Sequence, residues 1–221
     1  MKGSSFIAAF VLLFAPIFPM PGARLLAQGN PPPTTRDADD ATIHDLLHRM
    51  HKALANNDRK AFDSCFNVAP GTETFQKSVF EMNRAGLQFV EAAVKAYGAA
   101  SLEEFKHVEW KEGDASLSGG LDLPPRDDAA IDKVEVSVDG GQATLPNHEL
   151  RLEFAKKGDQ WLVDPTAAFP PGADPNGAAP LYNGMAKIFT DSAAEITSAK
   201  PPVHDLAVEM VKKLQHLMFG G

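Results

Sequence analysis

Apolar residues recur at helical spacing in the first and last parts of the chain. Between residues 41 and 97 they return every three or four positions, the period of a helix with one buried face. Asp40 or Thr42 can cap the first of these helices, and Asn56-Asn57-Asp58 ends it. The pattern predicts helices at about 41–55, 59–66, 73–97, 180–197 and 203–218.

After Gly98 the apolar period shortens to two, which is typical of strands. Val108 and Trp110 alternate with charged residues and predict a first strand. Segment 113–125 is rich in Gly, Ser and Asp, and it predicts a loop.

A series of short strands is predicted from Val134 onward. Val134, Val136 and Val138 lie on one side of the first strand, which we expect to face the core. Asp139-Gly140-Gly141 and Lys157-Gly158-Asp159 supply residues that tolerate positive φ, as tight hairpins require. Strands joined by such short turns must be antiparallel. The predicted strands are 134–138, 142–145, 150–154 and 160–164.

The order of these elements predicts an α+β fold class. Helices precede the strands instead of alternating with them, so we expect N-terminal helices packed on a curved antiparallel sheet. The expected α+β domain covers residues 41–164. A Pro- and Gly-rich linker at 165–179 leads to a C-terminal helical hairpin at 180–219, and its shortness favours a hairpin that folds back on the domain.

The N-terminus has the features of a secretory signal. Lys2 precedes an apolar run from Phe6 to Phe18, which is too short to span a bilayer, and small residues follow. We expect cleavage after Ala27, hence a signal peptide at 1–27 and an exported, periplasmic or extracellular protein. Residues 28–40 combine prolines and charges without large apolar side chains, and they predict a disordered tether.

Charge narrows the range of partners. The formal charge of the whole chain is -8, and removing residues 1–27 takes away Lys2 and Arg24 and no acid, which gives -10. Such a chain is poorly suited to nucleic acid or to an anionic membrane surface, and no stable membrane span is predicted once the signal is removed. Cys65 is the only cysteine, so no intramolecular disulfide can form, and its apolar setting predicts a buried thiol.

Several local motifs together resemble one superfamily. A first amphipathic helix is followed by a polar break and a short helix (Ala53 to Phe62), a strand and hairpin (Val134 to Ala143) and the ending Gly158-Asp159-Gln160-Trp161-Leu162-Val163-Asp164. The region resembles a nuclear transport factor 2-like domain, a cone-shaped α+β fold. The resemblance implies kinship with a superfamily that includes isomerases, dehydratases, polyketide cyclases and exported bacterial proteins without known activity. It transfers no catalytic residues, because the motifs describe turns and core positions.

Three histidines form the first candidate site. His44, His48 and His51 fall on one side of the predicted first helix, so their rings could converge on a metal ion such as zinc or copper. The alternative is a partly solvated polar margin of the helix, since the sequence shows no carboxylate that would support metal ligands apart from Asp45, which is expected to point elsewhere.

An acid and an imidazole form the second candidate site. Asp132 and His148 share the side of their predicted strands with apolar residues, so they could act as a catalytic base and its partner in the cone pocket. The alternative is that both reach solvent at strand starts. Asp127-Asp128 and Glu103-Glu104 are interpreted as ordinary solvated charges.

We therefore expect an exported, non-enzymatic binding or scaffold module without a cofactor, with a small apolar ligand and a homodimer as possible partners. The alternatives are a small isomerase or dehydratase that uses Asp132 and His148, and a His-rich metal-binding protein. Motifs of serine hydrolases, zinc peptidases, thiol redox proteins and nucleotide-binding loops are absent from the sequence.

Overall fold

The computed structural model describes residues 33–112, 115–121, 124–125, 127–145, 153–165, 169 and 173–219, with the backbone alone at 33–38, 110–112 and 115–119. The predicted signal peptide at 1–27 and the candidate catalytic residue His148 lie outside the described residues.

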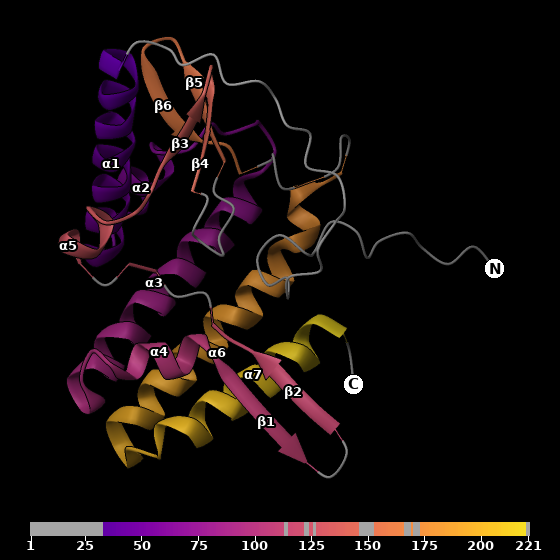
Figure 1. Cartoon of the computed structure of the whole chain (residues 1–221). Helices are drawn as coiled ribbons and strands as arrows, with labels where there is room; N and C mark the ends of the chain where they lie inside the picture. The colour runs from indigo at the N-terminus through magenta and orange to yellow at the C-terminus, as the bar shows by residue number, and fades with distance from the viewer. Residues whose placement is uncertain are drawn as a thin grey trace.

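The structure confirms the α+β class, with an antiparallel sheet and a C-terminal pair of helices (Figure 1). In chain order the elements are α1 (Pro33–Ala55), α2 (Arg59–Asp63), α3 (Glu73–Tyr97), α4 (Ser101–Lys106), β1 (Val108–Glu112), β2 (Ala115–Gly119), α5 (Asp128–Ile131), β3 (Ser137–Asp139), β4 (Gln142–Thr144), β5 (Glu153–Lys157), β6 (Gln160–Val163), a 3-10 helix (Pro175–Ala178), α6 (Ala179–Ala199) and α7 (Val203–Phe219).

The four-stranded sheet is an antiparallel meander in the order β3-β4-β5-β6. Its two predicted glycine turns are confirmed, with φ of 61° at Gly140 and 64° at Gly158. These angles suit glycine, which has no Cβ to clash. The inward row across the sheet is Val138, Ala143, Phe154 and Val163, paired in register.

Two strand predictions need correction. Segment 113–125, expected to be a loop, contains β2, which pairs with β1 as a separate two-stranded sheet. Residues 134–136, expected to be strand, have no regular structure, and β3 begins only at Ser137. Pairing with a neighbouring strand decides whether a segment becomes a strand, and the local pattern does not show this pairing.

The first core, here called the sheet core, lies between α1, α2, the start of α3 and the sheet. Its largest fully buried side chains come from all four parts, so the helices and the sheet fold as one body. They are Ile43 and Leu46 of α1, Phe62 of α2, Phe80 of α3, and Phe154 and Trp161 of the sheet, all 2% exposed or less.

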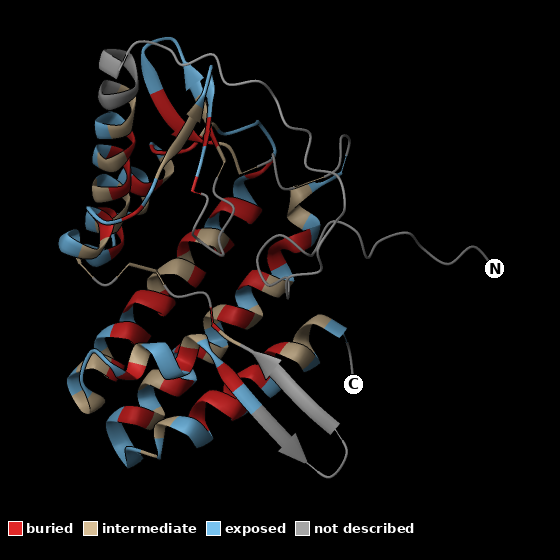
Figure 2. Cartoon of the chain, in the orientation of Figure 1, coloured by how far each residue is buried: buried red, intermediate tan, exposed pale blue. Residues whose placement is uncertain are grey.

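The second core, here called the helical core, lies between α3, α4, α6 and α7. Phe89 of α3 is fully buried, and its ring lies 4.9 Å from that of Phe105 in α4 and 5.7 Å from that of Phe189 in α6. Figure 2 shows buried positions along the whole length of α3, which contributes to both cores. The C-terminal pair of helices therefore shares a core with the predicted 41–164 domain and is not a separate appendage.

The first helix begins earlier than predicted. Residues 33–40, assigned to the tether from their composition, form the first turns of α1. Proline is well accepted in a first helical turn, so Pro33 does not oppose this start. A contact distant in sequence holds the region: the Asp39 carboxylate accepts hydrogen bonds from Lys156 Nζ at 2.7 Å and Trp161 Nε1 at 2.9 Å.

Replacing Asp39 by Asn is expected to lower the free energy of unfolding at neutral pH by about 1–2 kcal/mol, since hydrogen bonds to a charged group are lost. The bonds from Lys156 and Trp161 hold the pKa of Asp39 below its usual value. Its contribution is thus complete above about pH 4, the unfolded pKa, and is lost as pH falls through the lower folded pKa. Denaturant unfolding across acid pH measures this, with the exposed Asp45→Asn on the same helix as control. An equal loss for both variants would contradict the prediction.

Candidate functional site

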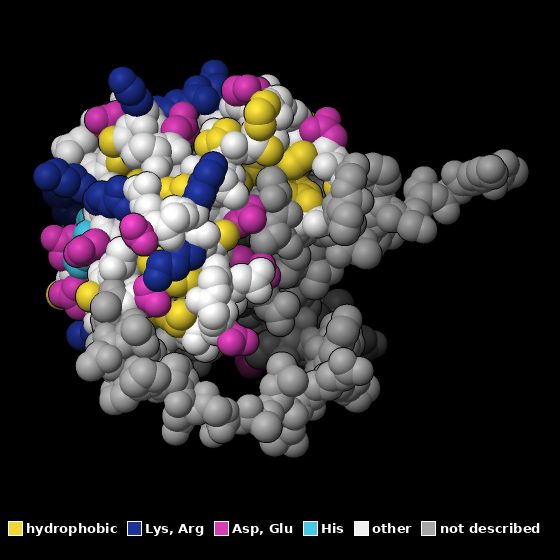
Figure 3. All heavy atoms as spheres, turned by 90° about the horizontal axis from the view of Figure 1, so that it is seen from above, with side chains coloured by type: hydrophobic (Ala, Val, Ile, Leu, Met, Phe, Trp, Pro, Cys, Tyr) yellow, Lys and Arg dark blue, Asp and Glu magenta, His cyan; other side chains and the backbone are white. Residues whose placement is uncertain are grey.

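A short helix brings two acids against α1. The Asp127 side chain caps α5 by accepting a hydrogen bond from Ala130 N at 3.0 Å, and Ile131, 1% exposed, anchors α5 in the sheet core. Asp128 and Asp132, at the start and just past the end of α5, then face the histidines of α1. Figure 3 shows histidine beside acidic side chains at the left margin, the side on which Figure 1 places α5.

His48 lies between the two carboxylates. Its Nδ1 is 3.1 Å from Asp128 Oδ1, and its Nε2 is 2.9 Å from Asp132 Oδ1. Carboxylates only accept hydrogen bonds, so His48 satisfies both partners only with a proton on each nitrogen. We call this arrangement of His48, Asp128 and Asp132 the histidine clasp. The clasp connects α1 to a segment distant in sequence, since His48 and Asp132 are 84 positions apart.

The electrostatics of the clasp agree with its geometry. Burial is the largest single influence and disfavours the charged ring, but the hydrogen bonds that the ring donates to Asp132 and Asp128, with the attraction of their charges, together outweigh it. The pKa of His48 therefore lies above its usual value. The carboxylates remain solvated, with the side chains of Asp128 and Asp132 75% and 64% exposed.

The other two candidate histidines have different surroundings. His44 places Nδ1 at 3.0 Å from the backbone oxygen of Asp40 and Nε2 at 2.9 Å from that of Val134. His51 Nδ1 is 3.7 Å from Asp128 Oδ1, and its Nε2 is buried without a hydrogen-bond partner. His44 thus fixes the backbone that leads into β3, while His51 lies beside the clasp.

The geometry gives no support to the metal hypothesis. Both nitrogens of His44 face backbone carbonyl oxygens and both nitrogens of His48 face carboxylates, so neither ring presents a free lone pair. Over the part of the chain that the structure describes, no group of three or more His, Cys, Asp or Glu side chains is arranged to hold a metal ion.

The environment of Asp132 differs from the one that the catalytic hypothesis predicts. Asp132 is not on a strand; it follows α5 as its C-terminal cap, is exposed, and is bonded to His48. Its proposed partner His148 lies outside the described residues. The imidazole that the structure places beside Asp132 is thus His48, at the surface.

The sequence pattern predicts that Asp127 and Asp128 are ordinary solvated charges, and this prediction is wrong. Asp127 caps a helix, and Asp128 accepts a hydrogen bond from His48. The signal available was local: an aspartate followed by Asp-Ala-Ala-Ile is a helix start with a capping side chain.

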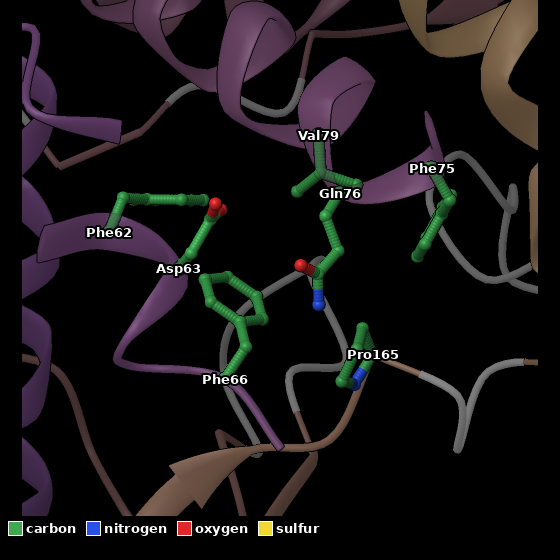
Figure 4. A pocket seen from close by; sticks show the side chains of 7 residues that line it. All are labelled: Phe62, Asp63, Phe66, Phe75, Gln76, Val79 and Pro165. Carbon is green, nitrogen blue, oxygen red and sulfur yellow. The ribbon is translucent and has the colours of Figure 1, made fainter. Parts of the chain in front are cut away.

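A small cavity lies at another place, where α2 meets the start of α3 (Figure 4). Its volume is about 10 Å³, which is about enough for one water. It contains no histidine. Its lining residues are Phe62, Asp63, Phe66, Phe75, Gln76, Val79 and Pro165.

No family model, curated protein or solved structure matches this chain. Among the described helices, none combines the length and the apolar character needed to cross a bilayer.

Replacing His48 by Gln is expected to lower the free energy of unfolding by about 1 kcal/mol in mild acid, where the ring carries its charge and the pair is partly solvated. Because the folded pKa is raised, this contribution is complete below about pH 6.5, the unfolded pKa, and is lost as pH rises through the folded pKa. Denaturant unfolding at about pH 5.5 measures the free energy of unfolding with the His48 ring charged, and unfolding at alkaline pH measures it with the ring neutral. His204→Gln, which removes an exposed histidine 3.7 Å from Glu104, is the control. If His48→Gln lost the same free energy of unfolding at both pH values, the result would contradict the clasp.

Proposed function

We propose that the chain is an exported, non-enzymatic binding or scaffold module whose interior is filled by its own side chains. The observation that carries this proposal is the packing of the sheet core. Ile43 and Leu46 from α1 and Phe154 and Trp161 from the sheet are all 1% exposed or less, and they fill the space between the helices and the sheet.

The surface histidines favour a structural role over a catalytic one. A general acid or base must reach a substrate atom in a site that binds the substrate. The clasp instead uses both nitrogens of His48 to join α1 to α5, on an exposed face. The isomerase or dehydratase alternative would need His148 and a cavity beside Asp132, and no described contact supports it.

The proposal also includes export of the protein and its membership of a superfamily. Support for export comes from the signal-like residues 1–27. Membership of the nuclear transport factor 2-like superfamily is also proposed, on the motifs of the sequence and on the compatibility of a helix-covered antiparallel meander with such a cone. A homodimer remains a prediction: the outward row Ser137, Thr144 and Glu153 is polar, which favours a hydrated contact over an apolar one.

A cavity-binding titration tests the filled interior. Indole is titrated into the isotope-labelled protein while the chemical shifts of Phe154 and Trp161 are followed. We expect no saturable shift in the wild type. Phe154→Ala serves as positive control, because deleting a fully buried ring leaves an apolar cavity that can bind such a molecule. Saturable binding of indole inside the wild-type sheet core would overturn the filled-interior proposal.

Export has an independent readout. The full chain is produced in a bacterial host, and the mature protein is sequenced from its N-terminus. We expect Gln28 as the first residue in the periplasmic fraction, and retention in the cytoplasm when residues 1–27 are deleted. An uncleaved chain that starts at Met1 and stays in the cytoplasm would contradict export.

A further inference from the structure

Three polar atoms of α2 and α3 are buried without a hydrogen-bond partner: Nε of Arg59, Oδ1 of Asp63 and Nε2 of Gln76. The atoms of Asp63 and Gln76 carry the argument here. Gln76 is 7% exposed, so bulk water does not solvate its amide. Buried polar groups in folded proteins nearly always have a partner, and an ordered water often provides it when no protein group does.

Both residues line the same cavity. Figure 4 shows the Gln76 amide projecting from α3 into the space beside Phe66 and Pro165, with Asp63 across from it on α2. The cavity has a volume of about 10 Å³. This size is about enough for one water.

The unpaired atoms of Gln76 and Asp63 are complementary. An amide nitrogen needs an acceptor and a carboxylate oxygen needs a donor, and a water molecule supplies both. The other oxygen of Asp63, Oδ2, lies 3.2 Å from Arg59 Nε, so the arginine neutralises the carboxylate without satisfying Oδ1. The aromatic walls offer no competing hydrogen-bond partner.

We infer that this cavity is a hydration site: a single ordered water accepts a hydrogen bond from Gln76 Nε2 and donates one to Asp63 Oδ1. The water connects α2 with α3 beside Pro165, where the chain leaves β6. Burial raises the pKa of Asp63, against the influence of Arg59, and a donating water lowers the cost of keeping its carboxylate charged. The inference does not depend on the proposed function.

Nuclear Overhauser contacts to water test the site in the intact chain. We expect the Gln76 side-chain amide protons to show a cross-peak to water whose sign marks a residence time longer than about a nanosecond. Water-oxygen relaxation dispersion counts long-lived waters, and Gln76→Leu, which keeps the size and removes the donor, should reduce the count by one. Gln160→Leu, at an exposed glutamine, is the matched control and should leave the count unchanged.

Two outcomes would overturn the inference. One is a wild-type protein without any long-lived water contact at the Gln76 amide, a measurement that needs no variant. The other is a Gln76→Leu protein with an unchanged count of long-lived waters and a higher melting temperature, because replacing a truly unpaired buried amide by an apolar group relieves a cost.

Discussion

A chain that stops at Asp164 is expected to lose cooperative folding. Truncation removes α6 and α7 and exposes the side of α3 and α4 that faces the helical core. Uncovering the five large side chains Met82, Phe89, Val90, Phe105 and Leu121, all at most 7% exposed in the full chain, costs on the order of 10 kcal/mol at about 2 kcal/mol each. That loss is as large as the net stability of a typical domain.

Thermal unfolding followed by circular dichroism, together with the dispersion of amide resonances, measures the effect. The matched control starts at Gln28 and keeps the C-terminus, so both proteins lack the predicted signal. We expect a sharp transition for the control and a gradual one for the 28–164 chain. A sharp transition and dispersed resonances in the truncated chain would show that the domain predicted from sequence is independent of the helical pair.

The elements that the sequence predicts well are those whose causes are local. The long helix α3 has the predicted bounds, Glu73–Tyr97, because its apolar stripe repeats over many turns and Gly98 ends it with φ of 91°. The hairpins at Gly140 and Gly158 follow from residues that accept positive φ. The fold class then follows from element order and short turns.

The parts that the sequence does not predict depend on contacts between distant residues. The first turns of α1 have a tether-like composition, yet Asp39 accepts a hydrogen bond from Trp161, 122 positions away. Similarly, the clasp joins His48 to Asp132 over 84 positions. The spacing of His44, His48 and His51 predicts a shared side of a helix, but only the packing of α5 decides that two carboxylates face that side.

Replacing Gly120 by Ala is expected to lower the free energy of unfolding by at least about 3 kcal/mol, near the upper end for overpacking. The reason is a close approach of two backbone segments. A Cβ at residue 120 would lie 1.6 Å from the backbone oxygen of Lys106, and the adjacent Leu121 N donates to Phe105 O at 2.9 Å. Because the obstacle is backbone, the segment after β2 must move away from α4, and Leu121, fully buried, is drawn from the helical core.

Denaturant unfolding measures this loss, and Gly141→Ala is the matched control. A Cβ at Gly141 would meet nothing within 4 Å, so we expect that variant to stay within about 0.5 kcal/mol of the wild type. The contrast separates steric approach from the general effect of changing a glycine. Equal stabilities for Gly120→Ala and Gly141→Ala would mean that the segment after β2 does not lie against the end of α4. The described contact between the β1–β2 hairpin and the helical core would then be wrong.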